Sequence, residues 1–373
     1  MEDDKHKNKD TISLTSTGLI KVSTSIQITH KFLFERAEIY FNKGFYLLNS
    51  KHLTGVIENY YFNISNNSSY IKEKKFVYEA LGLEEYKLAI ELFDKVIYLY
   101  PSFYLAFWAQ GIAVLRLGDY QRALNNFNIA IAIGTNKGIL YNTRGNAKWN
   151  LKDYEGAILD FQMSIKIDPD YVNSHINLAK TKTRIGDYKG ALEDLNHAVE
   201  IEPNNAIALF RRGEIKMFLK DYSGALSDLT NSIQIDSNKV MVYVWRGRAK
   251  NQLQEYEEAI IDYTKAIQID PNAAMAYSGR GRAKSDLKKY EEAIIDYTRA
   301  IQIDPNYDHP FRNRGLAKDY LKDYEGAIAD YTKAIEITPN SAPLYILRHS
   351  IRIKTGDISG ADEDLKKYHL LNT

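Results

Sequence analysis

Residues 257–270 read EEAIIDYTKAIQID, and the pattern of this stretch decides the fold. Its apolar residues recur at intervals of three and four positions, which places them on a single helical face. That face consists of Ala259, Ile260, Tyr263, Ala266 and Ile267. Pro271 follows directly and cannot continue a helix, so the helix is expected to end at the preceding Ile-Asp pair. The stretch therefore predicts an amphipathic helix with one buried face.

The same signals return every 34 residues along most of the chain. Prolines mark the period, and the two grid points without proline hold Thr135 and Ser237 in related sequences. Between successive prolines a glycine, a tyrosine and a pair of small residues recur, with room for two helices. The prolines are Pro101, Pro169, Pro203, Pro271, Pro305 and Pro339, and the glycines are Gly111, Gly145, Gly213, Gly247, Gly281 and Gly315. Such a period predicts a solenoid of stacked helical hairpins.

The recurring glycine and alanine residues predict close contacts between helices. A glycine inside a helix costs about 0.5–1 kcal/mol relative to alanine, so its recurrence requires a reason. We expect neighbouring backbones to approach too closely there for a larger side chain. At Ala266 and Ala300, a larger side chain is likewise expected to overpack the contact by roughly 1–3 kcal/mol.

These residues resemble the tetratricopeptide repeat (TPR) family. The family's order and spacing are matched by Tyr277, Gly281, Ala293, Tyr297, Ala300 and Pro305. The resemblance implies an all-α fold, an α-α superhelical solenoid of stacked helix-turn-helix units. One departure is systematic, because the position before the glycine, often leucine in the family, is here an arginine. These arginines are Arg144, Arg212, Arg246, Arg280, Arg314 and Arg348.

The repeat pattern divides the chain into four predicted parts. These are an N-terminal tail at 1–36, a degenerate TPR-like helical hairpin at 37–69, an array of eight TPR units at 70–341 and a C-terminal capping TPR at 342–373. The cap is expected because Asp362 and His369 replace aliphatic residues of the earlier units, and a solenoid needs a polar outer face at its end.

The N-terminal tail contains a short alternating stretch, in which Ile20, Val22, Ile26 and Ile28 are separated by polar residues. Alternation of this kind is typical of a strand. A lone strand has no ladder partner, so we expect a flexible tail. The alternative is an edge strand that a partner protein completes.

Composition excludes several classes of function. The formal net charge of +1 offers no general attraction to nucleic acid or anionic lipid. The absence of cysteine removes disulfides, thiolate chemistry and cysteine-ligated zinc. The charged N-terminus does not resemble a secretory signal, and no apolar run is long enough to cross a bilayer. We therefore expect a cytoplasmic protein that neither inserts into membranes nor binds nucleic acid.

No motif points to catalysis, a metal or a cofactor. The histidines are scattered, and the G-x-G at Gly279 and Gly281 lacks the third glycine of a nucleotide-binding loop. We therefore expect no enzyme. One acid and one lysine recur in each unit, as in Asp296 and Lys284. We expect these to form ion pairs between neighbouring helices, each worth about 0–1 kcal/mol if exposed.

Positions that differ between units are better candidates for function, because shared residues maintain the stacking. In the family that the chain resembles, the variable positions of the first helices line a concave groove. Large aromatic residues there are typical binding anchors, although they could equally fill gaps between helices. The same slots also hold Met217, Phe218 and Tyr320. The predicted peptide-binding groove comprises Trp108, Asn142, Asn146, Trp149, Asn177, Lys180, Arg184, Phe210, Arg211, Trp245, Arg248, Arg282 and Arg312.

The groove charges are mostly basic, which predicts a scaffold or adaptor that binds a peptide or helix of a protein partner with acidic residues. We expect a monomer or a weak homo-oligomer. One alternative is a self-associating structural or assembly protein. Another is a co-chaperone-like binder of acidic C-terminal peptides, because some family members grip a terminal carboxylate with lysines, asparagines and an arginine. Asn146, Asn177 and Arg211 match that clamp, whereas Asn142 and Ile207 stand where lysines belong, so the clamp is incomplete.

Overall fold

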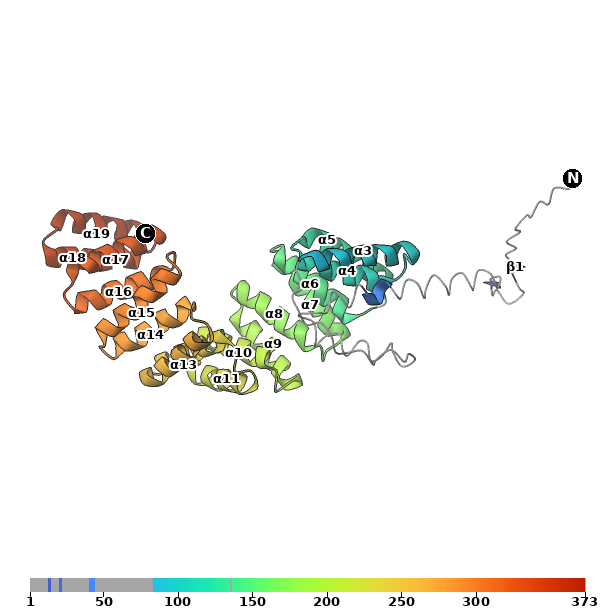
Figure 1. The fold of residues 1–373 in the computed structure, drawn as a ribbon, viewed down its shortest axis with the longest axis horizontal. Helices are drawn as coiled ribbons and strands as arrows, with labels where there is room; N and C mark the ends of the chain where they lie inside the picture. The colour runs from blue at the N-terminus through green and yellow to red at the C-terminus, as the bar shows by residue number, and fades with distance from the viewer. Residues whose placement is uncertain (1–12, 15–19, 22–39, 44–82, 135, 373) are drawn as a thin grey trace. The chain divides into compact units, whose positions relative to one another are not determined.

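The computed structural model describes residues 13–14, 20–21, 40–43, 83–134 and 136–372 (Figure 1). Within these residues the chain is a series of antiparallel helical hairpins that follow one another in sequence. It divides into two compact units, Met1–Thr181 and Lys182–Thr373. The boundary falls within helix α8, Val172–Arg184. Each unit is described by itself.

The first unit contains two complete hairpins. Its helices before α8 are α3 (Leu83–Leu99), α4 (Tyr104–Arg116), α5 (Tyr120–Ile133), α6 (Gly138–Asn150) and α7 (Tyr154–Ile167). Helix α4 pairs with α5, and α6 pairs with α7. A helical turn at 40–43 packs onto the start of this array, because the buried Phe41 ring lies 5.8 Å from the Phe93 ring and 5.1 Å from the Phe103 ring.

The second unit repeats the same hairpin. After the end of α8, its helices are α9 (Tyr188–Ile201), α10 (Ala206–Phe218), α11 (Tyr222–Ile235), α12 (Val240–Gln252), α13 (Tyr256–Ile269), α14 (Ala274–Asp286), α15 (Tyr290–Ile303), α16 (Asp308–Tyr320), α17 (Tyr324–Ile337), α18 (Ala342–Thr355) and α19 (Ile358–Asn372). From α10 to α19 each second helix packs against its own first helix, and α9, α11, α13, α15 and α17 pack against the first helix of the next hairpin. The structure thereby confirms the all-α repeat solenoid.

Of the predicted N-terminal parts, little lies within the described residues. Strand β1 (Ser13–Leu14) pairs antiparallel with β2 (Ile20–Lys21), with Leu14 opposite Ile20. The expectation of a lone strand at Ile20 is therefore wrong, because a nearby segment of the same tail supplies its hydrogen-bonding partner. The predicted hairpin at 37–69 lies outside the described residues except for 40–43, as does the beginning of the predicted array at 70–82. The eight-unit array and the cap remain predictions.

The second helices start where the sequence pattern places them. Asp153 precedes α7, and its carboxylate accepts a hydrogen bond of 2.9 Å from the backbone N–H of Gly156. An acceptor at this position satisfies one of the helix's otherwise unpaired N–H groups, which typically contributes about 1 kcal/mol. The same cap recurs at Asp119, Asp187, Asp221, Asp323 and Asp357.

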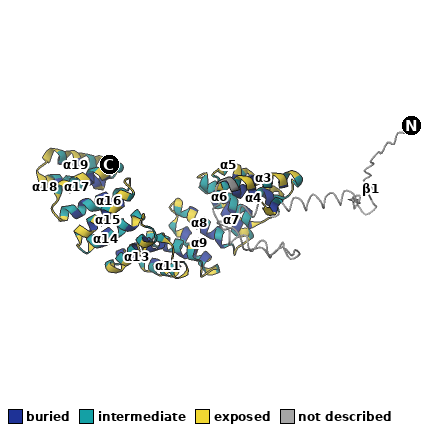
Figure 2. Ribbon diagram, in the orientation of Figure 1, coloured by how far each residue is buried: buried dark blue, intermediate teal, exposed yellow. Residues whose placement is uncertain are grey.

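The buried core explains the recurring glycine, but not in the way the sequence suggests (Figure 2). A Cβ added to Gly281 would lie 2.8 Å from the Tyr297 ring, and one added to Gly145 would lie 2.7 Å from the Phe161 ring. Both rings are almost fully buried. A larger side chain would clash at these glycines, as we expected. The expected cause, a close approach of neighbouring backbones, is wrong. The ring of the paired second helix fills the space that a side chain would need.

The arginine that departs from the family pattern ties three helices together. Arg280 on α14 donates to both carboxylate oxygens of Asp296 on α15, at 3.0 and 2.7 Å. It also donates to Thr264 on α13, at 3.2 Å, and lies over the Tyr277 ring. Lys284 completes the network with an ion pair of 3.0 Å to Asp296. The same arginine–aspartate–lysine arrangement holds Asp160, Asp228, Asp262 and Asp330, and in the last hairpin Arg348 and Arg352 hold Asp364.

These networks confirm the predicted ion pairs between helices and correct their energetics. Asp296 is only 2% exposed, so the small value for surface pairs does not apply. Removing one partner of a buried pair leaves a charge without compensation and typically costs about 3–5 kcal/mol. In the α3–α5 region, amide side chains replace the arginine. Gln110 on α4 donates a hydrogen bond of 2.7 Å to Asp94 on α3 and accepts one of 3.1 Å from Asn126 on α5, so it also connects three helices.

Candidate peptide-binding surface

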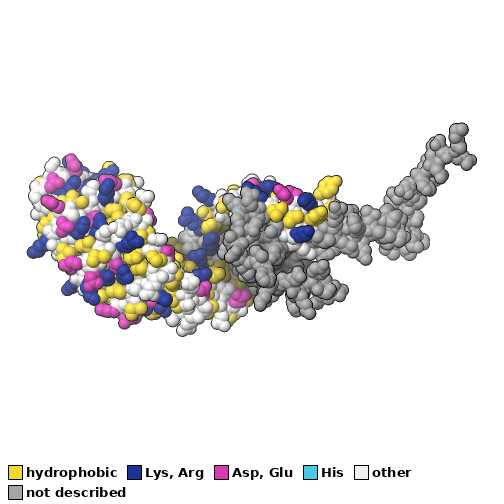
Figure 3. All heavy atoms as spheres, viewed as in Figure 1, with side chains coloured by type: hydrophobic (Ala, Val, Ile, Leu, Met, Phe, Trp, Pro, Cys, Tyr) yellow, Lys and Arg dark blue, Asp and Glu magenta, His cyan; other side chains and the backbone are white. Residues whose placement is uncertain are grey.

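The first helices of successive hairpins contact one another in the second unit, α10 with α12, α12 with α14 and α14 with α16. Their variable positions therefore share one surface. We call the exposed and half-exposed positions of α10, α12, α14 and α16 the first-helix surface. Figure 3 shows apolar and basic side chains intermixed over the face of the second unit that the view presents.

In the first unit, the structure brings several predicted residues together. The Asn142 side-chain oxygen accepts hydrogen bonds from Asn177, at 3.0 Å, and from Ser174, at 3.3 Å. Lys180 places its ammonium 3.5 Å from the centre of the Trp149 ring. A cation this close to an indole face is attracted to it by about 0.5–2 kcal/mol. Trp149 and Lys180 therefore form an aromatic–cation pair at the start of a candidate surface.

Two predicted residues of the first unit are less accessible than a binding surface requires. Trp108 is 4% exposed and belongs to the core that α3, α4 and α5 build. Asn142 is also buried, and its oxygen is engaged by the two hydrogen bonds above. Asn146 is half-buried, and its carbonyl accepts from Asn150. Trp108 therefore fills a gap between helices, which is the alternative to a binding anchor.

In the second unit, aromatic side chains form a continuous stack across three helices. The Tyr188 ring, at the start of α9, stacks on Phe218 at 5.0 Å, and Phe218 meets the Trp245 ring edge-on at 5.8 Å. The Arg248 guanidinium lies 4.7 Å from the Trp245 ring centre. Phe218 is 49% exposed despite these contacts. We call Tyr188, Phe218, Trp245 and Arg248 the aromatic stack.

The basic residues of the second unit differ in how far they are neutralised. Arg211 lies over the Phe210 ring and donates 2.6 Å to Glu214. Burial raises the pKa of Glu214, and the positive charge of Arg211 opposes that rise. Arg248 is exposed and forms no ion pair with any residue of the described part of the chain.

The remaining predicted arginines continue the surface. Arg282 is exposed, and its nearest carboxylate, Asp286, lies 3.9 Å away. Arg312 on α16 is half-buried, and Arg184 is exposed at the end of α8. Arg282 thus adds a second exposed guanidinium to that of Arg248 on the first-helix surface.

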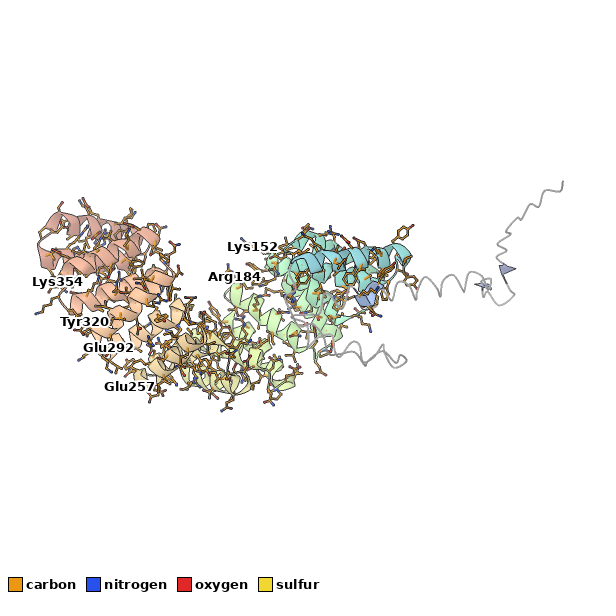
Figure 4. All side chains as sticks on the ribbon, in the orientation of Figure 1. Lys152, Arg184, Glu257, Glu292, Tyr320 and Lys354 are labelled. Carbon is orange, nitrogen blue, oxygen red and sulfur yellow. The ribbon has the colours of Figure 1, made fainter. Side chains whose placement is uncertain are left out.

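A second pair of aromatic residues lies further along the second unit. The Tyr290 and Tyr320 rings stack at 4.8 Å, and Lys354 lies over the Tyr324 ring while its ammonium bonds Asp319 at 2.7 Å. Figure 4 labels Tyr320 and Lys354, which come from α16 and α18. The tyrosines that open α9, α15 and α17 thus each contact a residue of the next first helix.

Sequence reasoning missed two components of this surface. Tyr188 belongs to the recurring tyrosines, so its invariance in the repeat concealed its place in the aromatic stack. The other component is an exposed apolar row, formed by Ile207, Met241 and Met275 at one slot of α10, α12 and α14. The signal was available, because an apolar residue recurs at this slot in three successive units.

The paired helices, repeated at a fixed interval, define an all-α repeat solenoid. Models described as tetratricopeptide repeat or TPR repeat match residues 75–138, 109–172, 172–205, 247–288, 274–307 and 313–341, which together make up more than half of the chain. The chain belongs to the tetratricopeptide repeat family, as its resemblance implies. Its architecture is that of a protein–protein interaction scaffold, a fold that is typically not enzymatic.

Several solved structures share this fold. The Cut9-Hcn1 hetero-tetramer of APC/C matches with a TM-score of 0.57 and 16% identity, over 71% of this chain and 52% of that chain. A tetratricopeptide repeat protein from Parabacteroides merdae matches with a TM-score of 0.54 and 18% identity, over 66% of this chain and 98% of that chain. MamA is 26% identical over 43% of this chain and 94% of its own, with a TM-score of 0.41. No curated protein matches the chain.

Among the described residues, no helix is both long and apolar enough to cross a membrane.

Proposed function

We propose that this chain is a scaffold or adaptor that binds a segment of a protein partner on the first-helix surface, and that the segment carries acidic residues. The aromatic stack is the observation that carries the proposal. Exposed aromatic residues held rigid by their neighbours are typical binding anchors, because they bury a large area at little entropic cost. Phe218 offers such a ring, and Arg248 places an unneutralised charge beside it.

The charge of the surface supports an acidic partner over a neutral one. Arg248 and Arg282 are exposed, whereas Glu214 on the same surface is already bonded to Arg211. A partner carboxylate can replace the water around these guanidinium groups without competing against a strong internal pair. We propose that the protein acts in this way in the cytoplasm, without a cofactor and without catalysis.

The carboxylate-clamp alternative has less support. Its proposed asparagine, Asn142, is buried, and its oxygen already accepts from Asn177 and Ser174. Arg211, the proposed clamp arginine, bonds Glu214 at 2.6 Å. A terminal carboxylate would have to displace that bond. Self-association remains an alternative that light scattering tests, since a monomer at micromolar concentration would exclude it.

The proposal is tested by selecting peptides from a displayed library of random short sequences on the wild-type protein. The selected peptides are then measured against Phe218→Ala, with Tyr98→Ala as the matched control, because Tyr98 is an exposed aromatic residue on α3. We expect Phe218→Ala to weaken binding at least about tenfold, as for a truncated anchor, and Tyr98→Ala to have no effect. Equal loss in both variants, or in neither, would reject the first-helix surface.

A further inference from the structure

The Tyr263 ring occupies an unusual position between two first helices. A Cβ added to Gly247 on α12 would lie 2.9 Å from the ring atoms Cε1 and Cζ, and one added to Gly279 on α14 would come closer still. The ring therefore lies between two stretches of helix backbone that carry no side chain. Tyr263 itself is 1% exposed. Gly247 and Gly279 have no side chains that could cover the Tyr263 ring. The residues next to these two glycines therefore form the surface over it.

Two arginines flank these glycines. Arg248 follows Gly247 directly, and Arg282 stands three positions after Gly279, close to one turn further along α14. Burial raises the pKa of Tyr263, and the charges of Arg248 and Arg282 both oppose that rise. Arg248 and Arg282 also occupy equivalent positions of successive units, 34 residues apart. Because α12 and α14 contact each other, the two arginines are neighbours on the first-helix surface.

The two guanidinium groups are available to a ligand. Arg248 contacts the Trp245 ring and has no carboxylate partner in the described part of the second unit. The Arg282–Asp286 separation of 3.9 Å is too long for a hydrogen bond, and both side chains are more than a third exposed. The same slot holds Glu214 one hairpin earlier and Leu316 one hairpin later.

We propose that Arg248 and Arg282 form a subsite that grips one anionic side chain of the partner segment. This inference rests on the proposed function and adds the partner's chemistry. A carboxylate or a phosphoryl group fits, because both present several oxygens to the planar guanidinium fork. Two guanidinium groups at equivalent positions of adjacent helices can both donate to such a group.

The same two helices also predict what lies beside the anionic residue. Met241 and Met275 precede Arg248 and Arg282 by seven positions, so each lies on the same face of its helix, about 10 Å away. Both methionines are exposed. An extended chain covers about 10 Å in three residues. An extended partner segment would therefore place an apolar residue three positions from its anionic residue.

The peptides selected on the wild-type protein supply the probe. Their affinities are measured for Arg248→Gln and Arg282→Gln, with Arg299→Gln as the control, because Arg299 is an exposed arginine on the second helix α15. We expect each subsite variant to bind at least about tenfold more weakly, since a charge-assisted contact is lost. The affinity should also depend less on salt, while Arg299→Gln and the thermal unfolding midpoints stay unchanged.

Replacing the acidic residue of a selected peptide by its amide should reproduce the loss, and a phosphoserine version distinguishes the two sources of the anion. Tighter binding of phosphoserine than of aspartate assigns a phosphoryl group, and the reverse assigns a carboxylate. An amide peptide that binds as tightly as either one overturns the subsite. If the arginine variants keep full affinity while Phe218→Ala loses it, the subsite is wrong and the proposed function stands. If all three keep full affinity, both are wrong.

Discussion

Replacing Asp296 with alanine is expected to destabilise the α14–α15 hairpin by about 3–5 kcal/mol. The carboxylate is almost fully buried, and it accepts two hydrogen bonds from Arg280 and one ion pair from Lys284. Its removal leaves both cations within the protein, with side chains only 19% and 16% exposed. Neither can regain full hydration without breaking its remaining contacts, which for Arg280 include Thr264 on the preceding hairpin.

The matched variant Arg280→Ala should cost less, about 1.5–3 kcal/mol, because Lys284 still neutralises Asp296. Long repeat arrays can unfold in parts, so a single global transition is a poor measure. Hydrogen exchange followed by mass spectrometry resolves the opening free energy of each helix instead. The reasoning is refuted if Asp296→Ala speeds exchange in α14 and α15 by no more than a surface pair would, or if Arg280→Ala costs more than Asp296→Ala.

Three further predictions address packing, backbone and pH. Gly281→Ala should lower stability by about 1–3 kcal/mol, because the new Cβ meets the Tyr297 ring, and an unchanged thermal midpoint would contradict this. Lys220 has a φ of 63°, a backbone conformation that glycine adopts readily and valine does not. In thermal unfolding, Lys220→Gly should stay within about 1 kcal/mol of wild type and Lys220→Val should lose about 1–2 kcal/mol. Equal midpoints of the two variants would contradict this. Burial raises the pKa of Tyr171 to about 12 from 10.0, so the folded state favours the neutral phenol. That contribution is complete below pH 10 and is lost as the pH rises toward 12, and Tyr171→Phe should flatten the decline in alkaline unfolding curves.

The helical hairpins were predictable because the apolar spacing and the proline both report on local structure. The stretch at 257–270 predicts a helix, and α13 runs from Tyr256 to Ile269. The ion pairs were predictable in identity, since their residues recur once in each unit. Their burial was not, because the burial of Asp296 depends on how α13, α14 and α15 pack around the Arg280 network.

The candidate site was only partly predictable for a related reason. Variable slots identified Trp245, Arg248 and Arg282, but no sequence pattern separates Trp108, which enters the core, from Trp245, which stays half-exposed. The partner of Phe218 is Tyr188, which lies 30 positions earlier and is one of the tyrosines that recur along the chain. That Arg248 and Arg282 are neighbours depends on the packing of α12 against α14, which periodicity does not describe.

Methionine methyl groups offer the most direct measurement of where a partner segment binds. The chain has 5 methionines, and Met241 and Met275 lie on the first-helix surface while Met163 lies on the second helix α7. Methyl NMR spectra of protein labelled at methionine, titrated with a peptide selected on the wild type, should show saturable shifts at Met241 and Met275 and none at Met163. Shifts confined to the Met163 signal would contradict binding on this surface. So would binding that saturates without shifting the methyl signals of Met241 and Met275.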